Sequence, residues 1–222
     1  MAEPTAEGVI RFEVEHETRV LEPRLHGEAA DVLSAWREVL ARLGLVGRDP
    51  ARYQGAGYGN LSARLAPFGD VGRGRRRFLV TGTQTGSLPR LTLAHYCVVE
   101  RYDLERNRVR SVGPLQPSSE SLTHGAIYDA APAARFVLHG HAPELWRHAR
   151  ALGLPVTRPE VANGTPAMAL EVRRLYRESA LSATGILAMG GHPDGVIAFG
   201  ATPEEAGGAL VRNLARALAI AP

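Results

Sequence analysis

The sequence contains no lysine, and all 26 of its basic residues are arginine. Without a lysine amine, no Schiff base with a carbonyl substrate can form, which excludes class I aldolase and pyridoxal chemistry. A Walker A phosphate-binding loop is excluded as well, because that loop requires a lysine. If the protein activates a carbonyl group, its electron sink must therefore be a metal ion or another cofactor.

Cysteine and long apolar runs are scarce too. The one cysteine, Cys97, cannot form a disulfide within the chain. No apolar run approaches the roughly 18 residues of a membrane-spanning helix, and the acidic first eight residues lack the apolar core of a signal peptide. We therefore expect a cytoplasmic protein without a membrane partner.

A strong charge imbalance is also absent, since the net charge is only +3 over 222 residues. The one dense basic cluster, at residues 73–77, lies in a glycine-rich loop. A nucleic-acid site and a solvated loop both fit such a cluster. The solvated loop is favoured because no aromatic platform or recognition motif accompanies the arginines, so no nucleic-acid partner is expected.

Apolar residues make up 45% of the chain, which is enough for a hydrophobic core. No linker or internal repeat divides the chain, and we expect one domain over residues 1–222. Alternating apolar residues predict a strand at 9–14. An apolar stripe with a period of 3.6 predicts a helix at 25–44.

Two loops combine glycine with polar side chains. The first runs from Tyr53 to Asn60, and the second from Thr81 to Gly86. Glycine lets the backbone approach a ligand closely, and hydroxyl and N–H groups form nests for anions. Each loop alone is typical of a plain turn. Their occurrence together, in a chain with a hydroxyl-rich helix start, favours an anion site.

That helix start is the run Pro117-Ser118-Ser119-Glu120. Ser118 or Ser119 is predicted to cap a helix that ends near residue 131. Glu120 then lies in the first turn, and His124 lies one turn later on the same face. Two roles are open for Glu120, namely stabilisation of the helix dipole or proton transfer as a general acid/base.

His139 and His141 stand two residues apart at the end of a short apolar strand predicted at 135–139. Side chains at that spacing in a strand point the same way. Two imidazoles on one face suit a first-row metal such as zinc. His192 lies at a strand–turn–strand junction, where it is either a turn residue or a third ligand, and spacing alone leaves this open.

Together these motifs resemble those of the class II aldolase/adducin family. The resemblance runs from about Leu25 to the C-terminus, and residues 1–24 look like an N-terminal extension. It depends on short motifs that occur in a consistent order: Gly59-Asn60-Leu-Ser62, Gly82-Thr-Gln-Thr85-Gly86, Pro117-Ser118-Ser119-Glu120 with His124, His139-Gly-His141, Gly164-Thr165-Pro166, and Gly191-His192 before Asp194-Gly195.

The resemblance implies a three-layer α/β/α sandwich around a mostly antiparallel central sheet, in a homotetramer with active sites at subunit interfaces. It implies that His139, His141 and His192 bind a divalent metal, with zinc as the first choice, and that Glu120 is the acid/base. The residues it assigns to a substrate phosphate are Asn60, Thr85, Gly86, Ser118 and Ser119. The implied activity is that of an aldolase or other lyase, acting on a small sugar phosphate or related hydroxy-carbonyl compound through an enediolate.

Two features bear on the reaction. Family aldolases generally use a tyrosine as proton donor, but residues 155–166 contain none and the chain has no aromatic tail, so the general acid is unidentified. The epimerase branch usually carries aspartate in place of Glu120, which favours a lyase. A sugar-phosphate epimerase, a dehydratase and a non-catalytic adducin-like interaction module are the alternatives. The three histidines and Glu120 favour an enzyme over the interaction module.

Overall fold

The computed structural model describes residues 8–220 of the chain. Residues 1–7 and 221–222 lie outside the described residues, and with them most of the acidic N-terminus that predicts the absence of a signal peptide. The predicted extension, residues 1–24, is therefore described from residue 8 onward.

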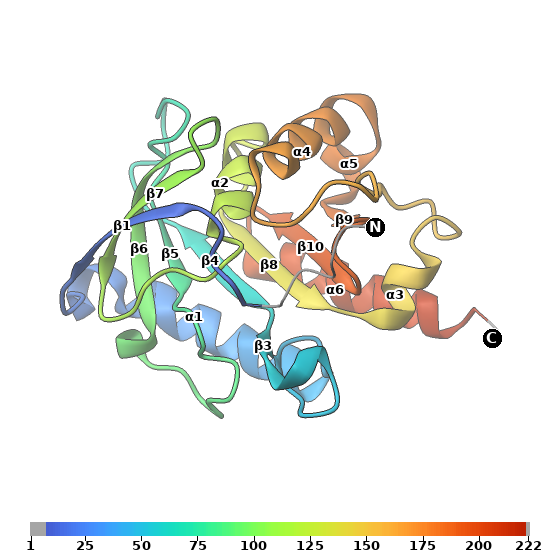
Figure 1. The fold of residues 1–222 in the computed structure, drawn as a ribbon, viewed down its shortest axis with the longest axis horizontal. Helices are drawn as coiled ribbons and strands as arrows, with labels where there is room; N and C mark the ends of the chain where they lie inside the picture. The colour runs from blue at the N-terminus through green and yellow to red at the C-terminus, as the bar shows by residue number, and fades with distance from the viewer. Residues whose placement is uncertain (1–7, 221–222) are drawn as a thin grey trace.

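A sheet of eight strands forms the centre of the molecule (Figure 1). The strands are β1 (Glu13–Thr18), β4 (Asn60–Arg64), β5 (Phe78–Thr81), β6 (Tyr96–Asp103), β7 (Arg108–Gly113), β8 (Phe136–His141), β9 (Ile186–Ala188) and β10 (Gly195–Gly200). Their order is β1-β7-β6-β5-β4-β8-β10-β9. Among the described strands only β1 and β7 pair in parallel, so the prediction of a mostly antiparallel sheet is confirmed.

Helices cover both faces of this sheet (Figure 1). One face carries α1 (Pro23–Arg42), α3 (Pro143–His148) and α6 (Pro203–Leu218), which pack through residues such as Leu33, Leu145 and Leu210. The other face carries α2 (Ser121–Ala130), α4 (Pro166–Glu178) and α5 (Leu181–Thr184), which pack through Leu122, Met168 and Leu181. The predicted three-layer sandwich is therefore confirmed.

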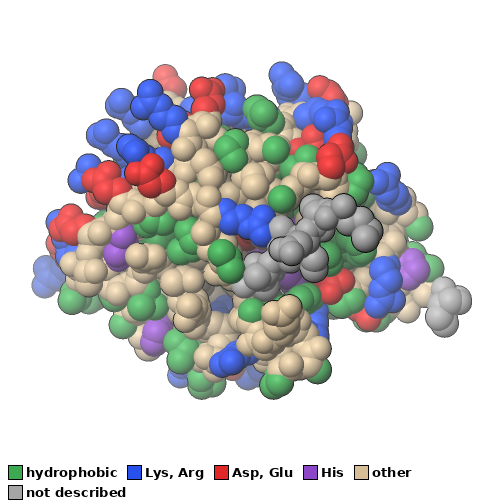
Figure 2. Space-filling model, viewed as in Figure 1, with side chains coloured by type: hydrophobic (Ala, Val, Ile, Leu, Met, Phe, Trp, Pro, Cys, Tyr) green, Lys and Arg blue, Asp and Glu red, His purple; other side chains and the backbone are tan. Residues whose placement is uncertain are grey.

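Shorter elements complete the fold. A two-stranded sheet pairs β2 (Gly47–Arg48) with β3 (Gly57–Tyr58), and two 3₁₀ turns cover Tyr53–Gly55 and Leu93–His95. Arginine and acidic side chains are interleaved on the surface near β1, β6 and β7 (Figure 2). None of the described helices is long and apolar enough to cross a membrane.

The strand predicted at 9–14 is wrong in its position, because β1 begins only at Glu13. Its partner β7 begins at Arg108, which lies opposite Glu13. The residues before Glu13 thus have no strand beside them, and residues 8–12 cross the end of the sheet in an irregular conformation.

The start of α2 also differs from the prediction. The helix begins at Ser121, Glu120 occupies the N-cap, and no side chain caps the helix. The Ser118 carbonyl accepts hydrogen bonds from the Ser121 amide (3.0 Å) and the Ser121 hydroxyl (2.7 Å). This tight turn precedes the helix and directs the side chains of Ser118 and Ser119 away from its first amides, so neither serine caps it.

Candidate functional site

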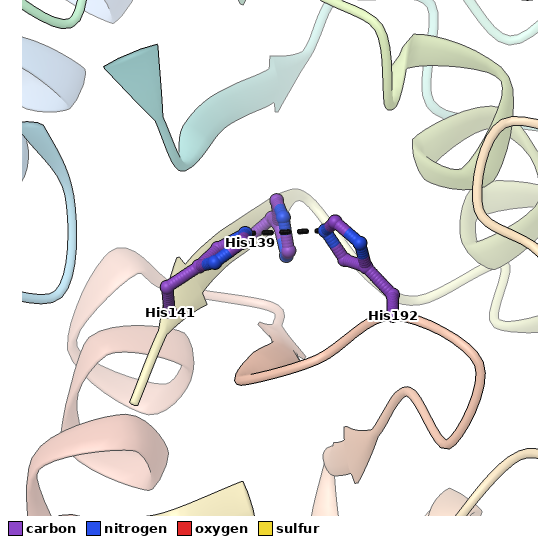
Figure 3. Close-up of side chains that lie close together, drawn as sticks. All are labelled: His139, His141 and His192. Atoms are coloured by element: carbon purple, nitrogen blue, oxygen red, sulfur yellow. Dashed lines mark hydrogen bonds between the residues drawn. The ribbon is translucent and has the colours of Figure 1, made fainter. Parts of the chain in front are cut away.

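Three histidines converge at the end of the sheet where β8 ends and β10 begins (Figure 3). Their ligand atoms all lie within 4.8 Å of one another, and all three side chains are buried. The Nε2 atoms of His141 and His192 are 3.1 Å apart. Two imidazoles bound to one zinc ion at 2.0–2.1 Å and a tetrahedral angle would place their nitrogens roughly 3.4 Å apart.

The local sequence explains this convergence. His139 and His141 both belong to β8, and the two-residue period of the strand turns them to one face as predicted. His192 lies in the turn before β10, where its carbonyl accepts from the Gly195 amide at 2.9 Å. A Cβ on Gly195 would lie 2.4 Å from the His192 ring, so only glycine leaves room for that ring.

His139 has one ring nitrogen available for a ligand. Its Nδ1 lies 3.1 Å from the Val196 carbonyl, which can only accept, so Nδ1 carries the proton. Its Nε2 is buried and has no hydrogen-bond partner among the described residues. A buried lone pair of this kind is costly unless it binds something, and a carbonyl on the other nitrogen is the usual way in which a metal-binding histidine is oriented. The triad therefore fits a divalent metal.

The electrostatic setting favours the neutral forms of His141 and His192. Burial lowers the pKa of both well below the usual value, the neighbouring histidines of the triad lower it further, and Arg52 and Arg11 add smaller effects at His141 and His192 respectively. A metal binds only the neutral imidazole, so the same burial and charges that disfavour protonation prepare the ligands.

A small polar hollow lies beside the triad. Its volume is about 30 Å³, about twice what one ordered water needs. It is lined by Gly8, Gly57, Gly59, Asn60, Gly82, Thr83, Gln84, Thr85, Gly86, Ser118 and Ser119. All five residues that the family resemblance assigns to a phosphate site are thus brought together. Asn60 is also paired with His139 across β4 and β8, so the hollow and the triad adjoin.

Two polar atoms in the hollow need a ligand. Ser118 Oγ and Asn60 Oδ1 are buried without a hydrogen-bond partner in the described part of the chain. A hydroxyl can donate, and a half-turn of the Asn60 amide presents its NH₂ group instead. An oxyanion would satisfy both side chains, whereas an empty hollow leaves them unsatisfied.

Arg37 of α1 supports the loop on the far side of this hollow. Its buried guanidinium donates to the carbonyls of Thr85 (3.1 Å) and Gly86 (3.2 Å). The loop also needs glycine at position 86, because a Cβ there would lie 2.5 Å from the Gly47 carbonyl oxygen. Arg37 falls within the helix predicted at 25–44, and sequence reasoning did not predict this contact.

Glu120 is fully buried at the N-cap of α2. Its Oε2 accepts from Thr123 Oγ1 at 2.9 Å, and its Oε1 accepts from Asn163 Nδ2 at 2.7 Å. Asn163 comes from the loop before α4, and that loop also contacts the residue next to His192, since a Cβ on Gly191 would lie 2.1 Å from the Val161 carbonyl oxygen. One loop thus joins the carboxylate to the third histidine.

A fourth histidine, His124, lies one turn further along α2. It is fully buried, its Nδ1 lies 2.7 Å from Ser62 Oγ, and its Nε2 has no partner among the described residues. Burial lowers the pKa of His124 to about 3, and the nearby His139 contributes to this shift. The predicted common face of Glu120 and His124 thus brings a fourth buried imidazole to the site, although not to the triad itself.

The structure also adds a tyrosine that sequence reasoning did not assign. Tyr53 packs edge-on against His141, with ring centroids 4.6 Å apart. Its hydroxyl donates to Asp194 at 2.6 Å and accepts from Arg52 at 2.7 Å. Burial raises the pKa of Tyr53, and the hydrogen bond to Asp194 raises it further. The only sequence signal was its place at the start of the first glycine-rich loop.

The family model described as "Class II Aldolase and Adducin N-terminal domain" matches residues 49–217. No curated protein matches the chain. The sandwich is shared with several solved structures, all below 25% identity, so these describe the fold.

L-fuculose-1-phosphate aldolase from Thermus thermophilus superposes with a TM-score of 0.59 at 23% identity, over 86% of this chain and 92% of that one. A sugar-phosphate aldolase from Thermotoga maritima gives a TM-score of 0.62 at 18% identity, over 88% and 98%. YgbL from Klebsiella pneumoniae, a putative aldolase/epimerase/decarboxylase, gives 0.60 at 20% identity, over 91% and 90%.

Proposed function

The chain belongs to the class II aldolase and adducin family, and we propose that it is a divalent-metal-dependent lyase. Its substrate would be a small hydroxy-carbonyl compound, preferably a sugar phosphate. The observation that carries this proposal is the junction of the buried histidine triad with a polar hollow whose Ser118 Oγ and Asn60 Oδ1 lack partners among the described residues.

The roles divide along that junction. His139, His141 and His192 would hold the ion, which when bound supplies a Lewis acid for the substrate carbonyl. Zinc is the first choice for three imidazole ligands. Asn60, Thr85, Gly86, Ser118 and Ser119 would hold the phosphate, and Arg37 keeps the Thr85–Gly86 loop in place.

Glu120 would move the proton. In the cleavage direction it returns a proton to the carbon next to the carbonyl, and in the condensation direction it removes that proton. Asn163 and Thr123 each donate to one of its oxygens and so fix the orientation of the carboxylate. Tyr53 stays protonated at neutral pH and is the candidate donor to the leaving aldehyde, the role for which the sequence offered no residue.

The alternatives differ in what they require. An epimerase or dehydratase would use the same metal and Glu120 but a different proton path. A non-catalytic interaction module would need neither, and would not explain three converging buried imidazoles, of which His141 and His192 have lowered pKa values, or the unsatisfied atoms in the hollow. A homotetramer, as the family resemblance implies, and a cytoplasmic location also remain part of the proposal.

The test combines metal analysis with proton exchange. One divalent ion per chain should copurify, and the variants His139→Ala and His192→Ala should each lose it. Glu120→Gln should keep the metal but lose exchange of the proton next to the carbonyl of a phosphorylated three-carbon hydroxyketone, by roughly two to four orders of magnitude. Exchange would be followed in D₂O by NMR.

Glu120→Gln suits this purpose because the site can accommodate it. The amide oxygen can accept from Asn163, while the new NH₂ can donate to the Thr123 hydroxyl, which rotates to accept. Glu105→Gln, at an exposed position in the hairpin between β6 and β7, is the matched control. Normal exchange in a folded, metal-loaded Glu120→Gln protein would show that the carboxylate is structural and that the lyase mechanism is wrong.

A further inference from the structure

The segment of residues 8–12 crosses the candidate site before it enters the sheet. Gly8 lines the polar hollow, and Phe12 is buried in the core. Between them, the Arg11 carbonyl accepts from Asn107 Nδ2 at 2.8 Å, and the Glu13 amide donates to the Asn107 carbonyl at 2.9 Å. In Figure 1 the segment leaves β1 and runs across β4. The backbone around Arg11 is therefore held in place.

The side chain of Arg11 lies against the loop that carries Asn163. A Cβ on Gly164 would lie 3.8 Å from Arg11 Cβ, 3.9 Å from Arg11 Cδ and 3.3 Å from the Ser119 carbonyl oxygen. The aliphatic part of Arg11 thus covers Gly164 next to Ser119. Ser119 lines the hollow, and the loop of Gly164 also carries Asn163. Arg11 therefore lies beside both the hollow and this loop.

Among the described residues, this half-buried guanidinium has no partner of opposite charge. Within residues 8–220, no carboxylate lies within ion-pair distance of it and it makes no side-chain hydrogen bond; the structure has such pairs elsewhere, as between Arg108 and Glu13 at 2.8 Å. None of its nitrogens is sealed from solvent. A cation whose stem packs beside Ser119, a residue of the hollow, and which has no carboxylate or hydrogen-bond partner within residues 8–220 is arranged to receive an anion.

We propose that Arg11 binds an oxyanion of the substrate between the Ser118–Ser119 hollow and the histidine triad. This inference takes the class of substrate from the proposed function. It adds that the positive charge of the anion site comes from a residue of the N-terminal segment. The hollow itself offers neutral donors only, because Arg37 is committed to two carbonyls behind it. Arg11 thus supplies the positive charge, and a planar guanidinium can bind two oxygens of the anion at once.

A phosphate and a carboxylate share this chemistry. Inorganic phosphate and acetate are therefore the two probes, titrated calorimetrically into the metal-loaded protein at constant, low ionic strength. Binding of phosphate but not acetate assigns a phosphorylated substrate, and the reverse assigns a carboxylate. For whichever anion binds, Arg11→Gln should weaken binding by about tenfold or more, as expected for loss of a charge-assisted hydrogen bond.

Two further variants make the comparison specific. Arg24→Gln removes the same charge at an exposed position in the first turn of α1 and should leave anion binding unchanged. Arg11→Lys keeps the charge but loses the two-pronged geometry, so its affinity should fall between those of the wild type and Arg11→Gln. Because the chain has no other lysine, the anion should also protect that single ε-amine from acylation.

The outcomes separate this inference from the proposed function. If Ser118→Ala weakens anion binding but Arg11→Gln does not, the hollow stands and Arg11 has no part in it. If the folded wild type binds neither anion, both the hollow and the role of Arg11 are wrong, while metal content still tests the triad. If Arg11→Gln and Arg24→Gln lose the same amount of anion affinity, the loss comes from the lower net charge of the protein. This result would also overturn the inference.

Discussion

His124 predicts how stability depends on pH, because its environment strongly disfavours the charged form. In the folded chain the pKa of this fully buried imidazole is about 3, whereas it is about 6.5 in the unfolded chain. Between these values the unfolded chain binds a proton that the folded chain does not. The free energy of unfolding therefore falls as the pH drops from about 6.5 toward 3, and the protein is most stable above that range.

The size of the effect follows from the shift. Each pH unit within the window costs about 1.4 kcal/mol for one such histidine. Integrated between pH 6 and pH 4, His124 alone contributes about 2.5 kcal/mol of lost stability, an order-of-magnitude figure for a group this deeply buried. That is a large share of the roughly 5–15 kcal/mol that stabilises a typical domain.

The variant His124→Asn isolates this contribution. In the wild type, His124 Nδ1 lies 2.7 Å from Ser62 Oγ. The asparagine amide can take over this hydrogen bond, but unlike the imidazole it does not titrate. Urea unfolding of the metal-free protein at several pH values should give a slope of stability against pH that is shallower by about 1.4 kcal/mol per unit than in the wild type. Metal is removed because it competes with protons for the other histidines.

His148→Gln, which removes a histidine of α3 outside the site, serves as the control for the loss of one histidine side chain. The reasoning would be refuted by parallel slopes for the wild type and His124→Asn between pH 6 and pH 4. Such a result would mean that His124 is charged in the folded protein, or that its burial is relieved before the chain unfolds.

Two further predictions concern the neighbours of the triad and the hollow. Tyr53→Phe should keep its metal but turn over a ketose phosphate at least roughly tenfold more slowly. If instead only its stability changes and the turnover per bound metal ion is that of the wild type, Tyr53 has a structural role and is not the proton donor. Gly86→Ala forces a Cβ to within 2.5 Å of the Gly47 carbonyl and 2.6 Å of Gly57 Cα, and should cost about 1–3 kcal/mol in denaturant unfolding. Gly27→Ala, where nothing lies within 4 Å, should instead stabilise its helix, and equal costs at both positions would contradict the packing argument.

The parts of the site that sequence could predict are those set by local geometry. The spacing of His139 and His141 in a strand fixes their common face whatever surrounds them. His192 was assigned by resemblance, because its place depends on the pairing of β10 with β8. The capping by Ser118 or Ser119 failed because the hydrogen bonds of Ser121 close a turn one step before the helix.

The contacts that sequence could not predict join distant segments. Tyr53 and Asp194 are 141 residues apart in the chain, and Arg11 meets Gly164 only because residues 8–12 cross the end of the sheet. Composition and periodicity identify an element but not what covers its end. The misplaced first strand is of the same kind, since only the starting point of β7 determines where β1 can begin.

The arginines around the site link its two halves. Arg52 and Arg11 each lower the pKa of one triad histidine, His141 and His192 respectively, in addition to the effect of burial. Neutral imidazoles are what a metal requires, so protons compete weakly for the ligands even below neutral pH. The same charges favour an anionic substrate next to the triad. In Arg11→Gln the pKa of His192 should therefore rise, and the affinity for the anion should fall. Metal binding at low pH and anion binding should thus decline together in this variant.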